Sequence, residues 1–271
     1  MPQMMAGKRG LIMGVANERS IAWGIAQALH AAGAEMAFTY QGAAFGKRVL
    51  PMVEKLGCKI VEEADVEDEP SLDRLFARLN KDWGRLDFVV HAIAFSDKEE
   101  LKGRYVDTTK ANFQRSLTIS CYSFTEIARR ALPLMTEGGS LITLTYEGAV
   151  RVMPSYNVMG VAKAALEASV RYLAADLGPQ GVRVNALSAG PMRTLAGAVI
   201  GSARYVYRLS REASPLRRNI ELTDVGGAAL YLLSDLSAGV TGTVHYVDAG
   251  YHAIGMPPSG NNGQNGEQNG E

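Results

Sequence analysis

Short apolar runs alternate with amphipathic stretches along almost the whole chain of 271 residues, and this alternation constrains the fold more than any other feature. Seven runs are predicted as strands: residues 9–15, 35–40, 87–94 and 140–146, and parts of 56–66, 181–191 and 243–250. Helical periodicity is clearest in residues 21–33, 47–56, 70–83, 155–177 and 223–233, with a further helical region before 132. Strands that alternate with helices predict an α/β fold: one doubly wound, seven-stranded parallel sheet with helices on both faces.

The composition narrows the classes of partner and compartment. The chain carries 28 basic and 28 acidic residues, so its zero net charge indicates no general attraction to nucleic acid or to an anionic membrane. No run is long and apolar enough for a signal peptide or a membrane span, and Cys58 and Cys121 lack metal-ligand spacing. We therefore expect free thiols, no metal and a cytoplasmic protein. Residues 1–256 are predicted as one domain, and the polar residues 257–271 as a disordered tail.

The first predicted strand ends at Gly14, and the next helix is expected to begin near Ser20 or Ile21. In an open parallel sheet, ligands bind beyond the carboxyl ends of the strands, and the free N–H groups of such a helix suit a pyrophosphate. Gly14 would allow close approach of the ligand, and Gly24 would let the helix pack tightly on the sheet. The spacing is not GxGxxG, however, so a plain strand–turn–helix explains the stretch equally well. The Ser20 hydroxyl could donate to a phosphate or cap the helix.

Polar residues also follow the second and third predicted strands. Gln41 stands where nucleotide-binding folds often place a carboxylate for the ribose 2′-hydroxyl or an arginine for a 2′-phosphate. Its neutral amide can bond a hydroxyl, and the nearest cations, Lys47 and Arg48, are expected within a helix, so NADH is favoured over NADPH. The pair at 65–66, Asp then Val, could hold an adenine by its amine and its ring face. Alternatively, the carboxylate caps the following helix.

Tyr156 and Lys163 stand seven residues apart in the longest predicted helix, residues 155–177. That spacing returns to nearly the same helical face after two turns, so a phenol and an ammonium would point into one site. A nearby cation favours phenolate, which predicts a lowered pKa for the tyrosine. The alternative is a surface helix with a solvated lysine and a half-buried tyrosine.

Several of these segments together resemble the bacterial NADH-dependent enoyl-acyl carrier protein reductases, a divergent branch of the short-chain dehydrogenase/reductases with a Rossmann-type fold. The resemblance covers residues 8–249 and rests on GVANERSIAWGIA, the Asp-Val pair, Tyr146, PSYNVMGVAKAALEASVRYLA and GVRVNALSAGPMRTLA. The discriminating motif is Tyr-x6-Lys, preceded by a tyrosine ten residues upstream. Most of the superfamily has Tyr-x3-Lys, but Gly160 occupies that lysine position here.

The resemblance implies a role for each matching residue. Tyr156 would bond the thioester carbonyl of a 2-enoyl chain, Lys163 would hold the nicotinamide ribose, and Tyr146 would line the pocket. Residues 195–208 would correspond to a mobile loop that covers the substrate. The positions that match cofactor contacts are Gly14, Ser20, Ile21, Gln41, Asp65, Val66, Ile93, Lys163, Met192 and Thr194.

Substrate and partners follow from the same resemblance. An apolar acyl slot would be lined by Ala94, Met159, Ala196, Val199, Ile200 and Tyr207, with ordinary packing as the alternative. The acidic acyl carrier protein would dock on Arg204, Arg208 and Arg211, unless these form a plain solvated face. The family is mostly tetrameric, which implies a homotetramer. Ala92, Ala94 and Met192 depart from the common pattern of Ser, Gly and Ile, and this bears on cofactor affinity and on diaryl ether inhibitors.

Two rival functions remain open at this level. A carbonyl or 3-ketoacyl reductase on the same fold would want a serine where residues 143–146 offer Thr143, Thr145 and Tyr146. A nucleotide-binding protein without catalysis would not need the complete tyrosine–tyrosine–lysine set. A hydrolase is excluded because no GxSxG elbow exists, and His91 is expected to be a packed residue.

Overall fold

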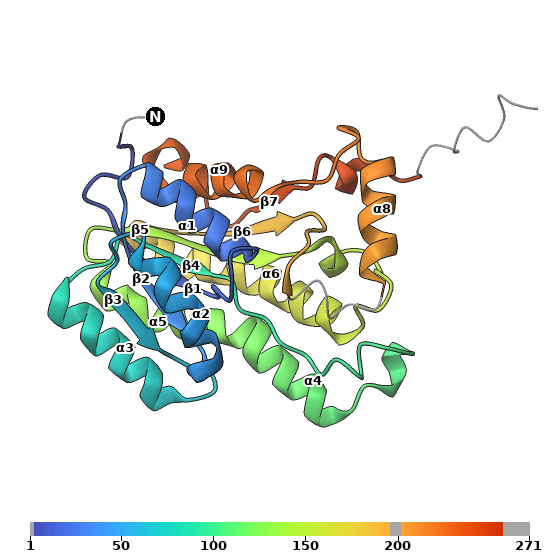
Figure 1. The fold of residues 1–271 in the computed structure, drawn as a ribbon, viewed down its shortest axis with the longest axis horizontal. Helices are drawn as coiled ribbons and strands as arrows, with labels where there is room; N and C mark the ends of the chain where they lie inside the picture. Colours follow the sequence, from blue (N-terminus) through green and yellow to red (C-terminus); the bar gives the residue numbers. More distant parts are fainter. Residues whose placement is uncertain (1–2, 196–201, 257–271) are drawn as a thin grey trace, which may run out of the picture.

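A computed structural model describes residues 3–195 and 202–256, and it confirms the predicted seven-stranded parallel sheet (Figure 1). The strand order is β3-β2-β1-β4-β5-β6-β7, and the order reverses between β1 and β4. The predicted tail, residues 257–271, lies outside the described residues. The strands are β1 Arg9–Met13, β2 Glu35–Tyr40, β3 Ile60–Glu63, β4 Phe88–His91, β5 Gly139–Thr145, β6 Val182–Ala189 and β7 Val244–Val247.

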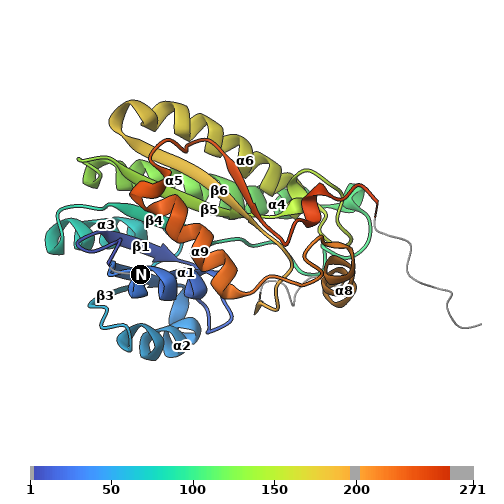
Figure 2. The ribbon, with the colours of Figure 1, turned by 90° about the horizontal axis from the view of Figure 1, so that it is seen from above.

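Helices cover both faces of this sheet, as expected from the strands, which are apolar on both sides (Figure 2). One apolar layer lies under α1, α2 and α9, and the other under α3, α5 and α6. The helices are α1 Ile21–Ala31, α2 Gly42–Glu54, α3 Glu69–Asp82, α4 Lys110–Leu117, α5 Ser123–Ala131, α6 Val158–Leu177, α8 Ala203–Ala213 and α9 Leu222–Leu233.

Gly24 on α1 has a different purpose from the one predicted. A Cβ atom there would lie 2.7 Å from the Cβ of Leu222 on α9, and a Cβ on Gly226 of α9 would lie 2.8 Å from the Gly24 carbonyl oxygen. The glycine pair therefore lets two helices touch by their backbones. The prediction that Gly24 lets α1 pack on the sheet is wrong, because its near neighbour is α9.

Several element boundaries differ from the prediction, and two of them affect the site. The strands β1 and β4 end at Met13 and His91, which leaves residues 14–15 and 92–94 in loops at the sheet edge. Residues 203–213 form α8, although 195–208 were expected to be a loop. The long helix α6 begins at Val158, three residues later than the predicted start at 155.

Candidate active site

The turn after β1 packs its backbone closely against the loop that follows β4. Gly14 has a φ of 100°, and a Cβ atom there would lie 2.1 Å from the carbonyl oxygen of Ala92 at the end of β4. The hydroxyl oxygen of Ser20 accepts from the N–H groups of Ala16 and Asn17, at 3.0 Å each. Ser20 makes no side-chain cap to α1, so the capping alternative is wrong. The first N–H groups of this helix, beginning at Ile21, face the sheet edge.

Gln41 and Asp65 meet beyond the ends of β2 and β3. The Gln41 amide donates to a carboxylate oxygen of Asp65 at 2.8 Å, and the other oxygen accepts from the Glu67 N–H at 2.9 Å. The N-cap of α3 is Asp68, so Asp65 braces a turn and does not cap that helix. The apolar neighbours Val66 and Ile93 pack partly against the core below this edge.

Tyr156 and Tyr146 lie together at the end of β5, with ring centroids 5.1 Å apart and ring planes at 72°. The prediction that Tyr156 and Lys163 share one helical face is wrong, because only Lys163 lies on the helix. Tyr156 precedes α6 and lies in a turn between Ser155 and Asn157, whose φ angles are 57° and 41°. Tyr156 is nevertheless buried, with only 8% of its surface exposed. The turn, and not a helical period, points its ring inward.

Gly148 and Gly160 explain why this chain lacks the Tyr-x3-Lys spacing. A Cβ atom on Gly160 would lie 2.7 Å from the carbonyl oxygen of Gly148, and one on Gly148 would lie 2.4 Å from the Tyr156 ring. Position 160 therefore has no room for any side chain, let alone a lysine. The lysine stands three residues further on, at Lys163.

Lys163 is buried on the first turns of α6, and its ammonium donates to the Leu144 carbonyl oxygen at 2.7 Å. Burial lowers its pKa from 10.5 to about 8, although Cys121 and Glu167 oppose that shift. Burial also raises the pKa of the Tyr156 phenol, with smaller contributions from Tyr146 and Glu167. The predicted lowering of the tyrosine pKa is wrong, because burial, Tyr146 and Glu167 all raise it.

Buried acidic residues around this pair were missed from the sequence. Glu167 lies one turn after Lys163, and its carboxylate accepts from the Thr145 hydroxyl at 2.7 Å. Glu147 is buried next to Tyr146, where it pairs with Arg151 at 2.9 Å, and burial raises its pKa. A glutamate four residues after a lysine, within an apolar helix, was the available signal for Glu167.

His91 is a packed residue, as predicted. Its Nδ1 lies 3.0 Å from the Thr143 hydroxyl and its Nε2 lies 2.9 Å from the Ser123 hydroxyl. Burial and the charge of Lys163 lower its pKa to about 3, so the imidazole is neutral at ordinary pH.

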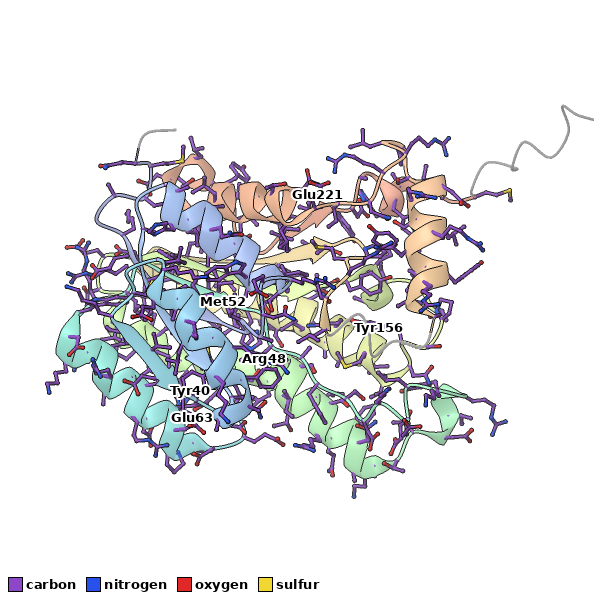
Figure 3. The ribbon with its side chains drawn as sticks, viewed as in Figure 1. Tyr40, Arg48, Met52, Glu63, Tyr156 and Glu221 are labelled. Atoms are coloured by element: carbon purple, nitrogen blue, oxygen red, sulfur yellow. The ribbon has the colours of Figure 1, made fainter. Side chains whose placement is uncertain are left out.

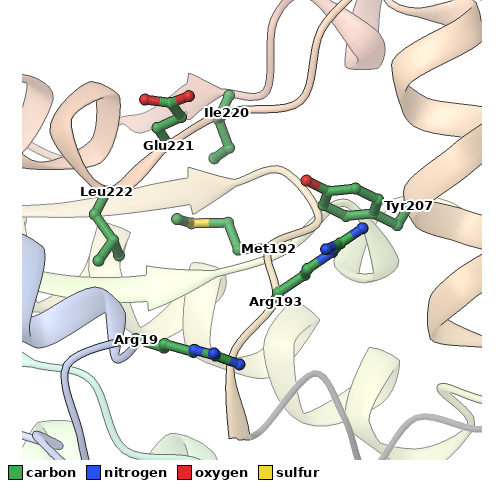
Figure 4. A pocket seen from close by; sticks show the side chains of 7 residues that line it. All are labelled: Arg19, Met192, Arg193, Tyr207, Ile220, Glu221 and Leu222. Carbon is green, nitrogen blue, oxygen red and sulfur yellow. The ribbon is translucent and has the colours of Figure 1, made fainter.

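A cavity of about 390 Å³ opens beside the segment after β6 (Figure 4). Met192 and Arg193 reach it from that segment, Tyr207 from α8 and Arg19 from the β1–α1 turn. The Arg193 guanidinium lies 4.8 Å from the centroid of the Tyr207 ring. The Thr194 N–H donates to the Met192 carbonyl oxygen at 3.0 Å, which makes a tight turn in the segment.

The expected acyl slot is described only in part. Met159 packs with Leu101, Tyr156 and Val158 in a small apolar cluster that Tyr146 also contacts. Ala94 is exposed in the loop after β4. Ala196, Val199 and Ile200 lie outside the described residues. Within residues 3–195 and 202–256, no helix could span a membrane and no group of three or more acidic, histidine or cysteine side chains could hold a metal ion.

Comparisons with known proteins agree with this arrangement. A family model described as "Enoyl-(Acyl carrier protein) reductase" matches residues 14–252. The chain is 63% identical to "Enoyl-[acyl-carrier-protein] reductase [NADH] 2" of Rhizobium meliloti, over 94% of this chain and 95% of that protein. Among solved structures, it resembles the Anaplasma phagocytophilum enoyl-acyl carrier protein reductase in complex with NAD (59% identity, TM-score 0.92, covering 96% and 99%). It also resembles FabI from Candidatus Liberibacter asiaticus (55%, TM-score 0.93, covering 95% and 100%).

Proposed function

The chain belongs to the enoyl-(acyl carrier protein) reductase family, and we propose that Tyr156 and Lys163 carry its reaction. The enzyme reduces the trans-2 double bond of enoyl thioesters with NADH, the last step of the fatty acid elongation cycle. The observation that supports these roles is the buried phenol of Tyr156. Its ring makes an edge-to-face contact with Tyr146 at the carboxyl edge of the sheet, where we propose that the cofactor binds.

The residues at this edge fit a dinucleotide. Gly14 lets the turn after β1 lie directly on the backbone of Ala92, and α1 begins after this turn without an acidic residue in its first turn, which suits a pyrophosphate. At the other end, the Gln41 amide already donates to Asp65. A 2′-phosphate at this position would face the Asp65 carboxylate, which favours NADH. Gly14, Ser20, Ile21, Gln41, Asp65, Val66, Ile93, Lys163, Met192 and Thr194 are the residues that we propose hold it.

When bound, NADH supplies the hydride that adds to the β-carbon of the enoyl thioester. Negative charge would then develop on the thioester oxygen as an enolate, and protonation of the α-carbon would complete the reduction. The Tyr156 hydroxyl is a donor for that oxygen, and its raised pKa keeps it protonated until charge appears. The Lys163 ammonium, held by the Leu144 carbonyl, adds a positive charge in a buried site where screening is weak. Tyr146 and Met159 exclude water around the phenol.

The structure also weighs against carbonyl reduction at this site. A carbonyl reductase would need a free hydroxyl at the end of β5, beside the tyrosine. The Thr145 hydroxyl donates to Glu167, and the Thr143 hydroxyl is paired with His91. Both hydroxyl groups are therefore already engaged, and Tyr146 occupies the next position.

Initial rates of NADH oxidation on a 2-enoyl and a 3-ketoacyl thioester of matched chain length test this choice. We expect rapid oxidation with the enoyl thioester and little with the ketoacyl thioester, and slower rates when NADPH replaces NADH. Faster turnover of the ketoacyl thioester would establish the rival function.

We propose that acyl carrier protein docks on the outer face of α8. Arg204, Arg208 and Arg211 are exposed there, and the first half of α8 belongs to the proposed substrate-covering segment, residues 195–208. A carrier protein is acidic, so a local basic face is needed on a chain whose net charge is zero.

Two further proposals concern assembly and location. We propose a homotetramer, because Tyr172 on α6 and Tyr122, in the π-helical turn Thr118–Tyr122 before α5, are 76% and 57% exposed. Light scattering of the purified protein gives the mass that tests it. We place the enzyme in the cytoplasm, and its free cysteines, Cys58 and Cys121, fit a reducing compartment.

A further inference from the structure

Asn157, the residue after Tyr156, joins the catalytic turn to a loop that lies more than fifty residues earlier in the chain. Its side-chain NH₂ group faces the carbonyl oxygens of Glu100, Leu101 and Gly103, at 3.3, 3.3 and 3.4 Å. Three acceptors therefore converge on one donor group. A residue of the same shape without N–H groups would place oxygen against oxygen at this point.

The backbone of the turn depends on the same residue. Asn157 has φ and ψ angles of 41° and −123°, and Ser155 on the other side of Tyr156 also has a positive φ of 57°. Asparagine tolerates positive φ better than most residues, but it does not enforce it. The three carbonyl contacts hold Asn157 in this unusual conformation, and Tyr156 is fixed between the two turns of the backbone.

The loop that receives Asn157 is itself braced. The Glu100 carboxylate accepts from the Thr109 N–H at 2.9 Å and from its hydroxyl at 2.8 Å, and the Asp97 N–H donates to Asn112 at 2.9 Å. Leu101, only 5% exposed, packs in the same apolar cluster as Tyr156. Asn157 is thus tied to a fixed frame next to the ring.

We propose that Asn157 is a positioning residue: its amide locks the turn that aims the Tyr156 hydroxyl at the thioester oxygen. This inference rests on the proposed function of Tyr156. Asn157 touches neither the substrate nor the cofactor in this account, so it acts on the rate of hydride transfer and not on NADH binding.

Two substitutions separate the amide from the backbone angle. Asn157→Gly keeps the positive φ and removes the donor, whereas Asn157→Asp keeps the shape and replaces the donor with an acceptor. We expect both to lower kcat by about tenfold or more at neutral pH, because a small misplacement of a catalytic group is costly. The dissociation constant of NADH, measured by fluorescence, should stay within about twofold of wild type and reports that the protein is folded.

The dependence of kcat on pH distinguishes a positioning role from a merely structural one. A carboxyl group that faces carbonyl oxygens takes up a proton more readily than usual, and the protonated acid is again a donor. The kcat of Asn157→Asp should therefore recover towards wild type as pH falls from about 7 to about 5, whereas that of Asn157→Gly should not. Charged groups on the receiving loop are engaged with one another or with the loop: Glu99 pairs with Lys102, Glu100 bonds Thr109 and Arg104 pairs with Asp107. Asn80→Asp, on the exposed face of α3, is the matched control and should behave like wild type.

The outcomes are distinct. Loss of kcat in both variants, with acid recovery in Asn157→Asp alone, supports the proposal. Wild-type kcat in either variant, or a loss without acid recovery, overturns it. A wild-type enzyme that fails to reduce enoyl thioesters would instead refute the proposed function itself, so the two failures are separable.

Discussion

The two ends of the ligand edge are built in different ways (Figure 3). At the β1–β2–β3 end, near Tyr40 and Glu63, the strands pass by short turns into helices, and Gln41 and Asp65 meet because parallel strands end at one edge. At the other end, Tyr156 lies in an irregular turn with positive φ angles on both sides, packed on Gly148 and tied down by Asn157.

The difference shows how the enzyme divides its work. In our proposal, the cofactor is held where strands pass into regular helices, by the beginning of α1 and by side chains at the strand ends. The catalytic phenol needs a position that no helix or strand offers, and backbone strain there is offset by packing and side-chain bonds. Changes at the two ends should therefore affect different constants: binding at the first and rate at the second.

Removing the phenolic hydroxyl should have the largest effect. We expect Tyr156→Phe to lower the rate of hydride transfer by about 10²–10³, as for the loss of one oxyanion donor. The ring and its packing against Tyr146 remain, so the dissociation constant of NADH should not change. Single-turnover NADH oxidation on an acyl carrier protein thioester gives the rate, and a value within about threefold of wild type would refute the assignment.

Ser20→Ala is the counterpart at the cofactor end. The substitution removes the hydroxyl oxygen that accepts from the N–H groups of Ala16 and Asn17 in the turn between β1 and α1. NADH affinity should therefore fall, while the rate at saturating NADH stays near wild type. An equal loss in NADH affinity and in the rate at saturation would contradict the distinction between the cofactor end and the Tyr156 end.

Crowding the Tyr156 turn should cost almost as much as removing the hydroxyl. A methyl group at Gly160 would press on the Gly148 carbonyl, 2.7 Å away, and displace the backbone on which the Tyr156 ring packs. We expect Gly160→Ala to lower kcat by about 10² and the free energy of unfolding by about 1–3 kcal/mol. Gly227→Ala in α9, where a Cβ meets nothing within 4 Å, is the matched control and should leave kcat unchanged.

The charge of Lys163 predicts how activity depends on pH. Burial lowers the pKa of the ammonium to about 8, so the charged form is present below that pH and is lost as pH rises through it. The kcat/KM of wild type should therefore fall by about tenfold per pH unit on the alkaline side. The arginine of Lys163→Arg stays charged on the alkaline side, so the kcat/KM of this variant should be lower than that of wild type but independent of pH in that range. A wild-type profile without an alkaline limb would show that the charge is not used.

The smallest effect is expected at the docking face. Arg204→Glu combined with Arg208→Glu should raise KM for an acyl carrier protein thioester by about fivefold, a loss of about 1 kcal/mol typical of exposed charge pairs. The KM for the matching coenzyme A thioester should stay the same, and high salt should reduce the difference. Equal effects on both thioesters would place the carrier protein elsewhere.

The sequence allowed correct prediction of the sheet, whereas the roles of the residues at its edge stay predictions. Periodicity located the seven strands, and Gln41 and Asp65 meet because parallel strands end at the same edge. The comparison with relatives supports the activity, which was first predicted from the Tyr-x6-Lys motif and its neighbours.

The geometry around Tyr156 was not predictable in the same way. The predicted helix began at residue 155 and so included Tyr156, whereas α6 begins at residue 158. Nothing in the local sequence pattern marks Ser155 and Asn157 as residues of positive φ. The bonds that hold Asn157 come from residues 100–103, and contacts of such long range leave no periodic signal. The same holds for the pKa of Tyr156, since burial depends on the folded surroundings and not on the nearest cation.

A double-mutant cycle between Gly160→Ala and Tyr156→Phe tests most directly whether the packing of this turn acts through the phenol. Single-turnover hydride transfer is measured for wild type, both single variants and the double variant. If Gly160 serves only to position the hydroxyl, then Gly160→Ala costs less than about twofold once the hydroxyl is gone. A full second loss in the double variant, so that the two effects multiply, would contradict the account.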